Sequence, residues 1–229
     1  KYKEQKEEEN NNNNDDYEIE LKAANDVEQN SKERQEAFNQ NIKQQFEVDE
    51  ARASVQSKIY KEKGDYKSMF KYAVEAYKSA AYGYEKFGDE KFLIRIPHII
   101  ESIEEAALNS GIENIASFGL LLYNDKTISQ PDYEKMAKYL RKAAIECEYR
   151  NCIIDYLDLV EREKVINKNY FELGKFYEKL RDYALVDKKV KEANKYFRSA
   201  VKYYRKGANF NQPDSMFEYA KLIKDRKIQ

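Results

Sequence analysis

The sequence predicts an all-α protein, an α-solenoid of antiparallel helix pairs that follows a long N-terminal helix. Three observations support this fold class. The 229-residue chain contains only seven Gly and three Pro and is 36% charged, a composition that favours long helices over strands joined by tight turns. Two Gly-Asp pairs supply helix stop and start signals. Small residues and aromatic residues recur together at a spacing typical of helical repeats.

The chain opens with a polar segment, KYKEQKEEENNNNNDD, in which Tyr2 is the only apolar residue. A run of acids followed by polyasparagine cannot bury enough apolar surface to offset the entropy of ordering. We therefore expect residues 1–16 to form a disordered, acidic and Asn-rich tail.

The next segment, residues 17–62, contains no Pro or Gly and predicts one long, polar, amphipathic helix. This helix carries a sparse apolar stripe, which consists of Val27, Phe38, Ile42, Phe46, Val48, Ala51, Val55 and Ile59. Such a stripe can pack on the chain's own repeats or pair with a partner helix as a coiled coil. We expect packing on the repeats.

The pairs Gly64-Asp65 and Gly88-Asp89 each end one helix with glycine and start the next with an aspartate N-cap. The segment SVQSKIYKEKGDYKSMFKYAVEAYKSAAYGYEKFGD places aromatic and small residues at helical spacing around these signals. It resembles a tetratricopeptide unit, which implies helical hairpins over residues 50–110. Because Pro97 lacks an N–H group, we expect a helix to start at Pro97, with the single histidine, His98, in its first turn.

Internal similarity is clearest in the second half of the chain. Ala106-Ala107 precedes Ala143-Ala144 by 37 residues, and Ala208 lies 64 residues after Ala144. Ala208 closes KYYRKGA, which keeps the Tyr, Arg, Lys and Ala order of KYLRKAA. The 37-residue interval lies within the period of a helical repeat array, and the segment before Ala208 matches by its order of residues.

Residues 115–144 read IASFGLLLYNDKTISQPDYEKMAKYLRKAA, and this order of residues resembles a Sel-one-like repeat of the tetratricopeptide superfamily. The resemblance implies Sel-one-like repeats over residues 111–229, with the last repeat incomplete. It also implies adaptor duty, since such proteins serve as assembly platforms in signalling, cell-wall regulation and protein degradation at the endoplasmic reticulum. Glu148 replaces an expected glycine, so we expect a degenerate or expanded repeat between residues 148 and 190.

Residue sizes in the repeats predict how the helices pack. We expect small side chains where paired helices approach closely, at Ala107, Ala116, Gly119, Ala144 and Ala208. We expect large side chains to fill the space between them, at Leu120, Leu121, Tyr123, Tyr139 and Leu140.

The sequence gives no support for an enzyme. It has one histidine, no Gly-rich phosphate loop and no nucleophile elbow, and we propose no catalytic, cofactor-binding or metal-binding residue. Cys147 and Cys152 lie five residues apart and point to different helix faces, which predicts free thiols and favours a cytoplasmic location. The lumen of the endoplasmic reticulum is the alternative if a targeting segment was removed. With a net charge of −1, the chain has no overall attraction for nucleic acid.

One surface is a candidate for partner binding. Between residues 187 and 208, cationic side chains recur at three- and four-residue steps, and we call them the basic stripe: Lys188, Lys191, Lys195, Arg198, Lys202 and Arg205. The apolar set of the same segment, on another side, is Val190, Ala193, Phe197, Ala200, Val201, Tyr204 and Ala208. The stripe is either a solvated face or a dock for an acidic peptide or protein surface. Nucleic acid is disfavoured, because no paired aromatic surface accompanies the stripe.

The last helix, PDSMFEYAKLIKDRKIQ, resembles the first helix of a further repeat. We expect it to expose the end of the array through Met216, Phe217, Tyr219 and Leu222, which a further segment or another subunit would cover.

These observations favour a non-catalytic scaffold or adaptor for protein–protein interaction. It would bind a protein or peptide, possess no membrane span and belong to a larger complex. Two alternatives stay open at this point. The chain is a structural subunit of a large cytoskeletal or membrane-associated assembly, or it is the regulatory repeat array of a longer enzyme such as a kinase.

Overall fold

The computed structural model describes the backbone of residues 2–124, 132–166 and 168–224. Among residues 2–24 it describes the side chain of residue 22 alone, and from residue 25 onward it describes the side chains of these ranges. The described backbone contains helices and no strand, which confirms the predicted all-α fold. The helices are α1 (Tyr2–Glu62), α2 (Tyr66–Phe87), α3 (Glu90–Ser110), α4 (Ile112–Asn124), α5 (Tyr133–Glu146), α6 (Arg150–Glu161), α7 (Tyr170–Val186), α8 (Val190–Asn209) and α9 (Pro213–Lys224).

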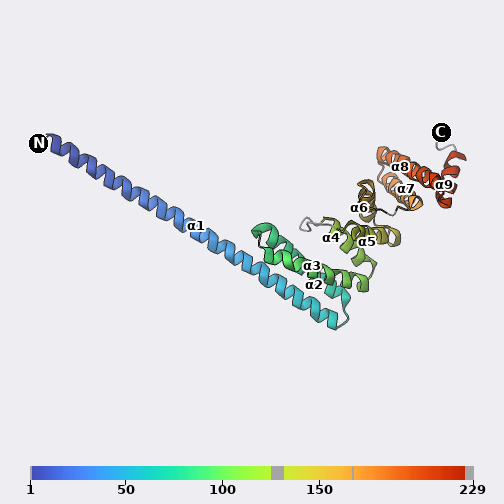
Figure 1. The fold of residues 1–229 in the computed structure, drawn as a ribbon, viewed down its shortest axis with the longest axis horizontal. Helices are drawn as coiled ribbons and strands as arrows, with labels where there is room; N and C mark the ends of the chain where they lie inside the picture. Colours follow the sequence, from blue (N-terminus) through green and yellow to red (C-terminus); the bar gives the residue numbers. More distant parts are fainter. Residues whose placement is uncertain (1, 125–131, 167, 225–229) are drawn as a thin grey trace.

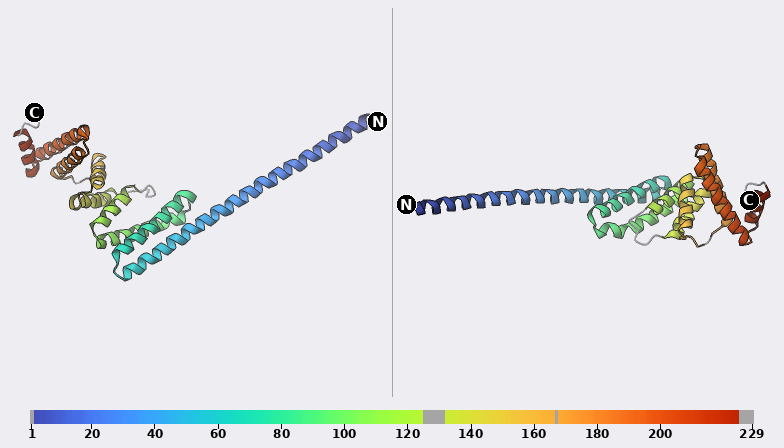
Figure 2. Two further views of the ribbon diagram at one scale, coloured as in Figure 1. Left: turned by 180° about the vertical axis from the view of Figure 1, so that it is seen from behind. Right: turned by 90° about the horizontal axis from the view of Figure 1, so that it is seen from above.

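The helices follow one another in space in the order of the chain (Figure 1). Most helices pack chiefly on their sequence neighbours, most extensively in the pairs α1–α2, α2–α3 and α7–α8. Helix α1 extends far beyond the other helices, and the two termini lie at opposite ends of an elongated molecule (Figures 1 and 2). Residues 25–41 of α1 are all exposed, and burial begins at Ile42.

The apolar stripe predicted for α1 is only partly used. Its members divide into half-buried Ile42, Phe46 and Ile59 and exposed Val27, Phe38, Val48, Ala51 and Val55. The face that packs is instead buried at Glu50, Ala53 and Ser57. Two of these three residues are polar, so apolar periodicity does not reveal this face. In addition, α1 begins at Tyr2, so it includes residues that the composition predicts to be a disordered tail.

The prediction that a helix starts at Pro97 is wrong, because α3 runs through this residue from Glu90 to Ser110. The helix starts at Glu90, seven residues before Pro97. The side chain of Asp89 caps it by accepting the backbone N–H of Lys91 at 2.9 Å. An interior proline costs roughly 3 kcal/mol. Phe92 and Ile96, which precede Pro97 in the same helix, are buried. Burial of each side chain stabilises the fold by about 1.5–3 kcal/mol, which offsets the cost of the proline.

Side chains cap the start of four helices. Asp65, Asp89, Asp132 and Asn169 each accept a backbone N–H from the first turn, at distances between 2.9 and 3.2 Å. These bonds satisfy donors that have no partner within the helix, so the four residues define the starts of α2, α3, α5 and α7.

Helix ends differ in residue type between the two halves of the chain. After α1, α2 and α3, the turn residues with positive φ are Gly64, Gly88 and Gly111. After α5, α6, α7 and α8, they are Glu148, Glu163, Lys188 and Asn211, with φ values between 55° and 58°. Glu148 therefore adopts the left-handed conformation of the glycine that the repeat pattern expects at this position.

The small residues predicted at helix contacts are buried at Ala107, Ala116, Gly119 and Ala144. Ala208 is half-buried, so that prediction is off by one residue, and the buried residue is Gly207. A Cβ atom on Gly207 would lie 2.1 Å from the hydroxyl oxygen of Ser215 on α9, which leaves room for glycine alone. Among the predicted large side chains, Tyr139 and Leu140 are buried, and Leu120, Leu121 and Tyr123 are half-buried against the core.

Tyrosine hydroxyls donate hydrogen bonds to carboxylates on other helices, and we call these bonds the Tyr–carboxylate bonds. They are Tyr123 to Asp158 at 2.6 Å, Tyr204 to Glu178 at 2.8 Å, Tyr139 to Glu104 and Tyr177 to Glu161. Burial, together with the carboxylate partner, raises the pKa of all four phenols, and that of Tyr123 to about 12. The two residues of a bond are up to 35 positions apart in the sequence, so these bonds join different helices.

The boundary between α6 and α7 combines an aromatic contact with polar contacts, and the rings of Tyr156 and Phe176 meet there edge to face at 5.8 Å. Backbone packing between these helices is slight compared with that in the pair α7–α8. The guanidinium group of Arg150 donates to Asp187 at 2.6 Å, and the hydroxyl group of Tyr183 donates to the carbonyl oxygen of Glu148 at 2.8 Å. We call this boundary the α6–α7 seam. It falls within residues 148–190, where the sequence predicts an irregular repeat.

Candidate functional site

The basic stripe lies along one side of α8. Lys191, Lys195, Arg198, Lys202 and Arg205 follow one another at steps of four, three, four and three residues, which keeps them on one face of the helix. Lys188 precedes them in the turn between α7 and α8. All six side chains are exposed. The structure thus brings the predicted residues together as one continuous surface.

The opposite side of α8 fixes the orientation of the stripe. Tyr204 is fully buried, and its ring packs directly against Gly174 of α7. A Cβ atom on Gly174 would lie only 2.3 Å from the ring carbon Cε1 of Tyr204. Its hydroxyl group donates to Glu178 on α7 at 2.8 Å. Helix α8 therefore cannot rotate about its own axis without breaking this contact, and the stripe must face outward.

The stripe is not neutralised by the protein itself. Residues 187–208 contain eight Lys and Arg and two acids, although the whole chain has a net charge of −1. None of the six stripe cations lies within ion-pair distance of a carboxylate among the described residues. Elsewhere in the second half, Arg141 pairs with Glu172 at 2.6 Å and Lys175 pairs with Glu218 at 3.0 Å. The stripe is therefore a local positive surface whose charges face solvent.

The apolar set predicted for α8 divides into two groups. Ala193, Ala200 and Tyr204 are buried in the contact with neighbouring helices. The other four form what we call the apolar row: Val190 is 60% exposed, and Phe197, Val201 and Ala208 are half-buried. The apolar row separates the buried face of α8 from the basic stripe.

The predicted exposed end of the array is correct for two of its four residues. Met216 and Phe217 on α9 are 48% and 68% exposed. Tyr219 is half-buried, and Leu222 is buried in the core with 6% exposure, so its prediction is wrong. Leu222 lies on the side of α9 that contacts α7 and α8, because α9 packs on this pair by the face that also carries Ser215.

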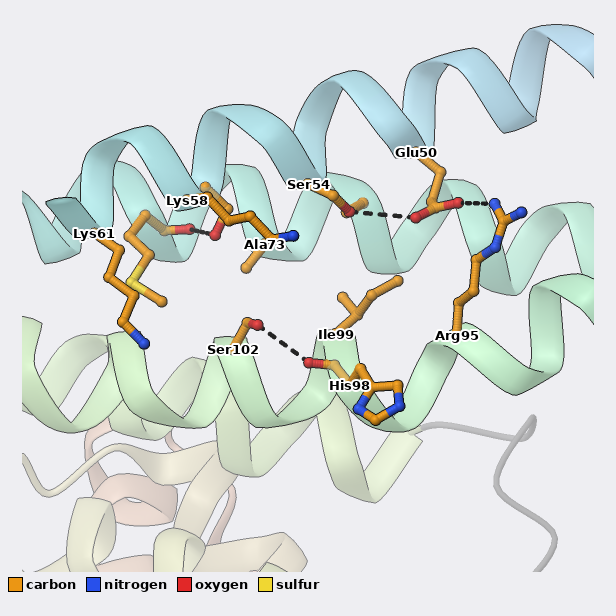
Figure 3. Close-up of a pocket in the computed structure, with 12 residues that line it drawn as sticks. Glu50, Ser54, Lys58, Lys61, Ala73, Arg95, His98, Ile99 and Ser102 are labelled. Atoms are coloured by element: carbon orange, nitrogen blue, oxygen red, sulfur yellow. Dashed lines mark hydrogen bonds and ion pairs between the residues drawn. The ribbon is translucent and has the colours of Figure 1, made fainter.

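A groove between α1, α2 and α3 is a second candidate site, with a volume of about 350 Å³ (Figure 3). Met69, Ala73 and Ala76 of α2 form its floor. Its walls carry polar residues of α1 and α3: Glu50, Ser54, Ser57, Lys58 and Lys61 on α1, and Arg95, His98 and Ser102 on α3.

The charges of this groove are already paired within the protein. The carboxylate of Glu50 is 7% exposed, pairs with Arg95 and accepts the hydroxyl of Ser54 at 3.2 Å (Figure 3). Lys61 pairs with Glu105 of α3 at 2.6 Å. These pairs connect α1 to α3 over α2, which is a structural role. Sequence reasoning missed Glu50 and Arg95 because they lie 45 residues apart and belong to no motif.

The remaining reactive side chains form no catalytic arrangement in the described part of the chain. The imidazole of His98 is 83% exposed and lies 3.6 Å from the carboxylate of Glu101, in the middle of α3 and not in the first turn of a helix. Cys147 and Cys152 are free, and burial raises the pKa of the Cys152 thiol to about 11, which disfavours the reactive thiolate. No cluster of described residues has the donor set of a metal site. No described helix has both the length and the apolarity to cross a bilayer.

Comparison with known proteins gave no match to any family model, curated protein or solved structure.

Proposed function

We propose that the protein is a non-catalytic scaffold that docks an acidic protein surface on the basic stripe of α8. The observation that carries this proposal is the absence of ion pairs at all six stripe cations among the described residues, on a helix whose orientation is fixed from behind. Exposed cations in a row attract an acidic partner and suppress like-charged ones. The stripe serves this purpose better than the α1–α3 groove, whose charges Glu50, Arg95 and Lys61 have partners already.

The proposal includes an α-solenoid of tetratricopeptide and Sel-one-like repeats. Helices α4 and α5 hold the residues that resemble the repeat, and α7 and α8 form the most similar second pair. Contacts between sequence neighbours support this arrangement, since repeat proteins bury their apolar faces mainly on the adjacent unit. The long α1 would then be an arm in front of the array, and the location would be the cytoplasm.

A structural subunit of a larger assembly is the second candidate. Two described surfaces favour it: residues 25–41 of α1, all exposed, and the exposed Met216 and Phe217 on α9. They lie far apart along the molecule (Figure 1), so a large assembly could contact both. Under this alternative the basic stripe is one contact among several.

Charge reversal tests the proposed function. The double variant Lys195→Glu and Lys202→Glu should bind a polyglutamate peptide roughly tenfold more weakly than the unchanged protein, because exposed ion pairs contribute about 0.2–1 kcal/mol each and reversal replaces attraction by repulsion. Fluorescence anisotropy at two salt concentrations measures this, since screening over about 8–10 Å weakens the unchanged protein more than the variant.

Lys71 and Lys78 on α2 supply a matched control. They are exposed and seven residues apart, as are Lys195 and Lys202. Lys71 lies over a tyrosine ring at 5.4 Å, and Lys202 does so at 5.5 Å. Reversal of Lys71 and Lys78 changes the net charge equally and should leave binding nearly unchanged. Equal losses in both double variants would mean that only net charge matters and would refute the stripe as a site.

A further inference from the structure

The apolar row lies beside the basic stripe and bears on which kind of partner this surface fits. Val190 is 60% exposed, and Phe197 and Val201 are half-buried although they also contact the core. Leu185 and Val186, at the end of α7, are also exposed, at 50% and 81%. Apolar surface that lies directly beside a row of unpaired cations favours a contact area, because one partner surface can cover both.

The spacing of the cations distinguishes a helical partner from an extended one. From Lys191 to Arg205, five cations span fourteen residues of α8, which is about 21 Å at 1.5 Å per residue. Acidic residues at three- and four-residue steps on a partner helix have the same pitch, so every cation can meet one acid. Alternate residues of an extended strand lie about 6.7 Å apart, and four such intervals cover about 27 Å. An extended acidic peptide therefore loses register along the stripe.

We propose that the stripe and the apolar row together dock an amphipathic α-helix of a partner protein, with an acidic row over Lys191, Lys195, Arg198, Lys202 and Arg205 and an apolar row over Val190 and Val201. This inference rests on the proposed function and adds the form of the partner to it. The apolar row gives the contact a water-excluding edge, and the stripe sets the register of the helix. A nucleic acid strand would neutralise the cations but would leave the apolar row uncovered.

Two synthetic peptides of identical composition test the inference with the full chain. In the first, Glu residues recur at alternating three- and four-residue steps beside a row of Leu. In the second, the same residues are permuted so that Glu and Leu lie around the whole helix. We expect the first peptide to bind roughly tenfold more tightly in fluorescence anisotropy, since only it can satisfy both rows. Equal affinities would overturn the amphipathic-helix inference.

Variants separate the two rows. Val190→Ser should weaken binding of the first peptide and leave binding of polyglutamate unchanged, whereas Lys195→Glu with Lys202→Glu should weaken both. Val55→Ser is the matched control, because Val55 is 55% exposed and lies on α1, which does not pack on α8. Circular dichroism of each variant establishes that the fold is intact, since Val190 and Val55 are both exposed.

Each outcome decides between the proposals. One outcome is that charge reversal weakens binding while the permuted peptide binds as tightly as the first and Val190→Ser leaves the affinity unchanged. In that case the acidic dock stands and the helical partner is wrong. If charge reversal has no effect on either peptide or on polyglutamate, both proposals are wrong. If a single-stranded oligonucleotide displaces the first peptide at equal concentration, the surface binds polyanions without regard to shape, which also overturns the inference.

Discussion

The first half of the molecule, α1 to α4, and the second half, α5 to α9, both place residues with positive φ after their helices but use different residue types there. In the first half the positive-φ positions are Gly64, Gly88 and Gly111, and in the second half they are occupied by larger, mostly charged residues. The second half contains only Gly174 and Gly207, and both lie inside helices at close contacts. Glycine thus serves both turns and helix packing in the first half, but only helix packing in the second.

This difference has a function in the second half. A left-handed residue other than glycine costs about 1–2 kcal/mol of local strain. The side chains at these positions make contacts or carry charge that glycine lacks. Glu148 forms an ion pair with Lys179, and Lys188 adds a cation at the end of the basic stripe. Side chains at these turns therefore contribute to packing between helices and to the candidate docking surface, which glycine could not do.

Alkaline pH should have the largest effect, because each Tyr–carboxylate bond involves a helix of the second half. The phenol pKa is about 10 in an unfolded chain and is raised to about 12 for Tyr123 and Tyr156 in the fold. Above pH 10 the unfolded chain loses protons that the folded chain retains, so the free energy of unfolding falls as pH rises from 10 through 12. Far-UV circular dichroism, recorded with tyrosinate absorbance, should show loss of helix in this window. A helix signal that is unchanged while the phenols ionise would contradict the bonds.

Overpacking should have the next largest effect. Gly174→Leu places a side chain into the ring of Tyr204 and should lower the free energy of unfolding by about 1–3 kcal/mol, measured by urea denaturation. Gly119→Leu makes the corresponding change in the first half, where a Cβ would lie 3.2 Å from the backbone nitrogen of Leu140. We expect a loss in both, since packing glycines occur in both halves. An unchanged midpoint for either variant would show that its glycine is not at a tight contact.

Exchanging the turn residues tests the comparison directly. Gly88→Ala should destabilise the fold by about 1 kcal/mol through backbone strain alone, because no atom lies within 4 Å of the new Cβ. The reciprocal change, Glu163→Gly, should stabilise it by about 0.5–1 kcal/mol, because φ of Glu163 is 58°. Thermal denaturation measures both. The comparison fails if both changes shift the midpoint in the same direction.

Lys188→Gly should have the smallest effect on stability, a gain of about 0.5 kcal/mol, and it should weaken binding of an acidic peptide by a factor of roughly two. Opposite changes in stability and affinity would show that the charge at this turn is kept for binding. Asn211→Gly is the control, because Asn211 has φ of 56° but lies outside the stripe. It should leave binding unchanged, and asparagine tolerates this conformation better than lysine does.

The sequence predicted the helical fold and the position of the stripe well, because both depend on local periodicity. Its errors have specific physical causes. Pro97 did not start a helix, because the N-cap of Asp89 and the burial of Phe92 outweigh the local penalty. Leu222 is buried because α9 packs on α7 and α8 by the face that carries this residue. The pair of Glu50 and Arg95 joins residues 45 positions apart, and no local pattern reports such a contact.

The α6–α7 seam has less backbone packing than the boundary between α7 and α8. The ion pair of Arg150 and Asp187 at this seam weakens in high salt, whereas apolar contacts such as those between α7 and α8 do not. We expect α7–α9 to behave as a separate cooperative unit, whose amides exchange with solvent at a lower free energy than those of α2 and α3. The proposed docking surface on α8 would then belong to a unit that opens independently of α2 and α3.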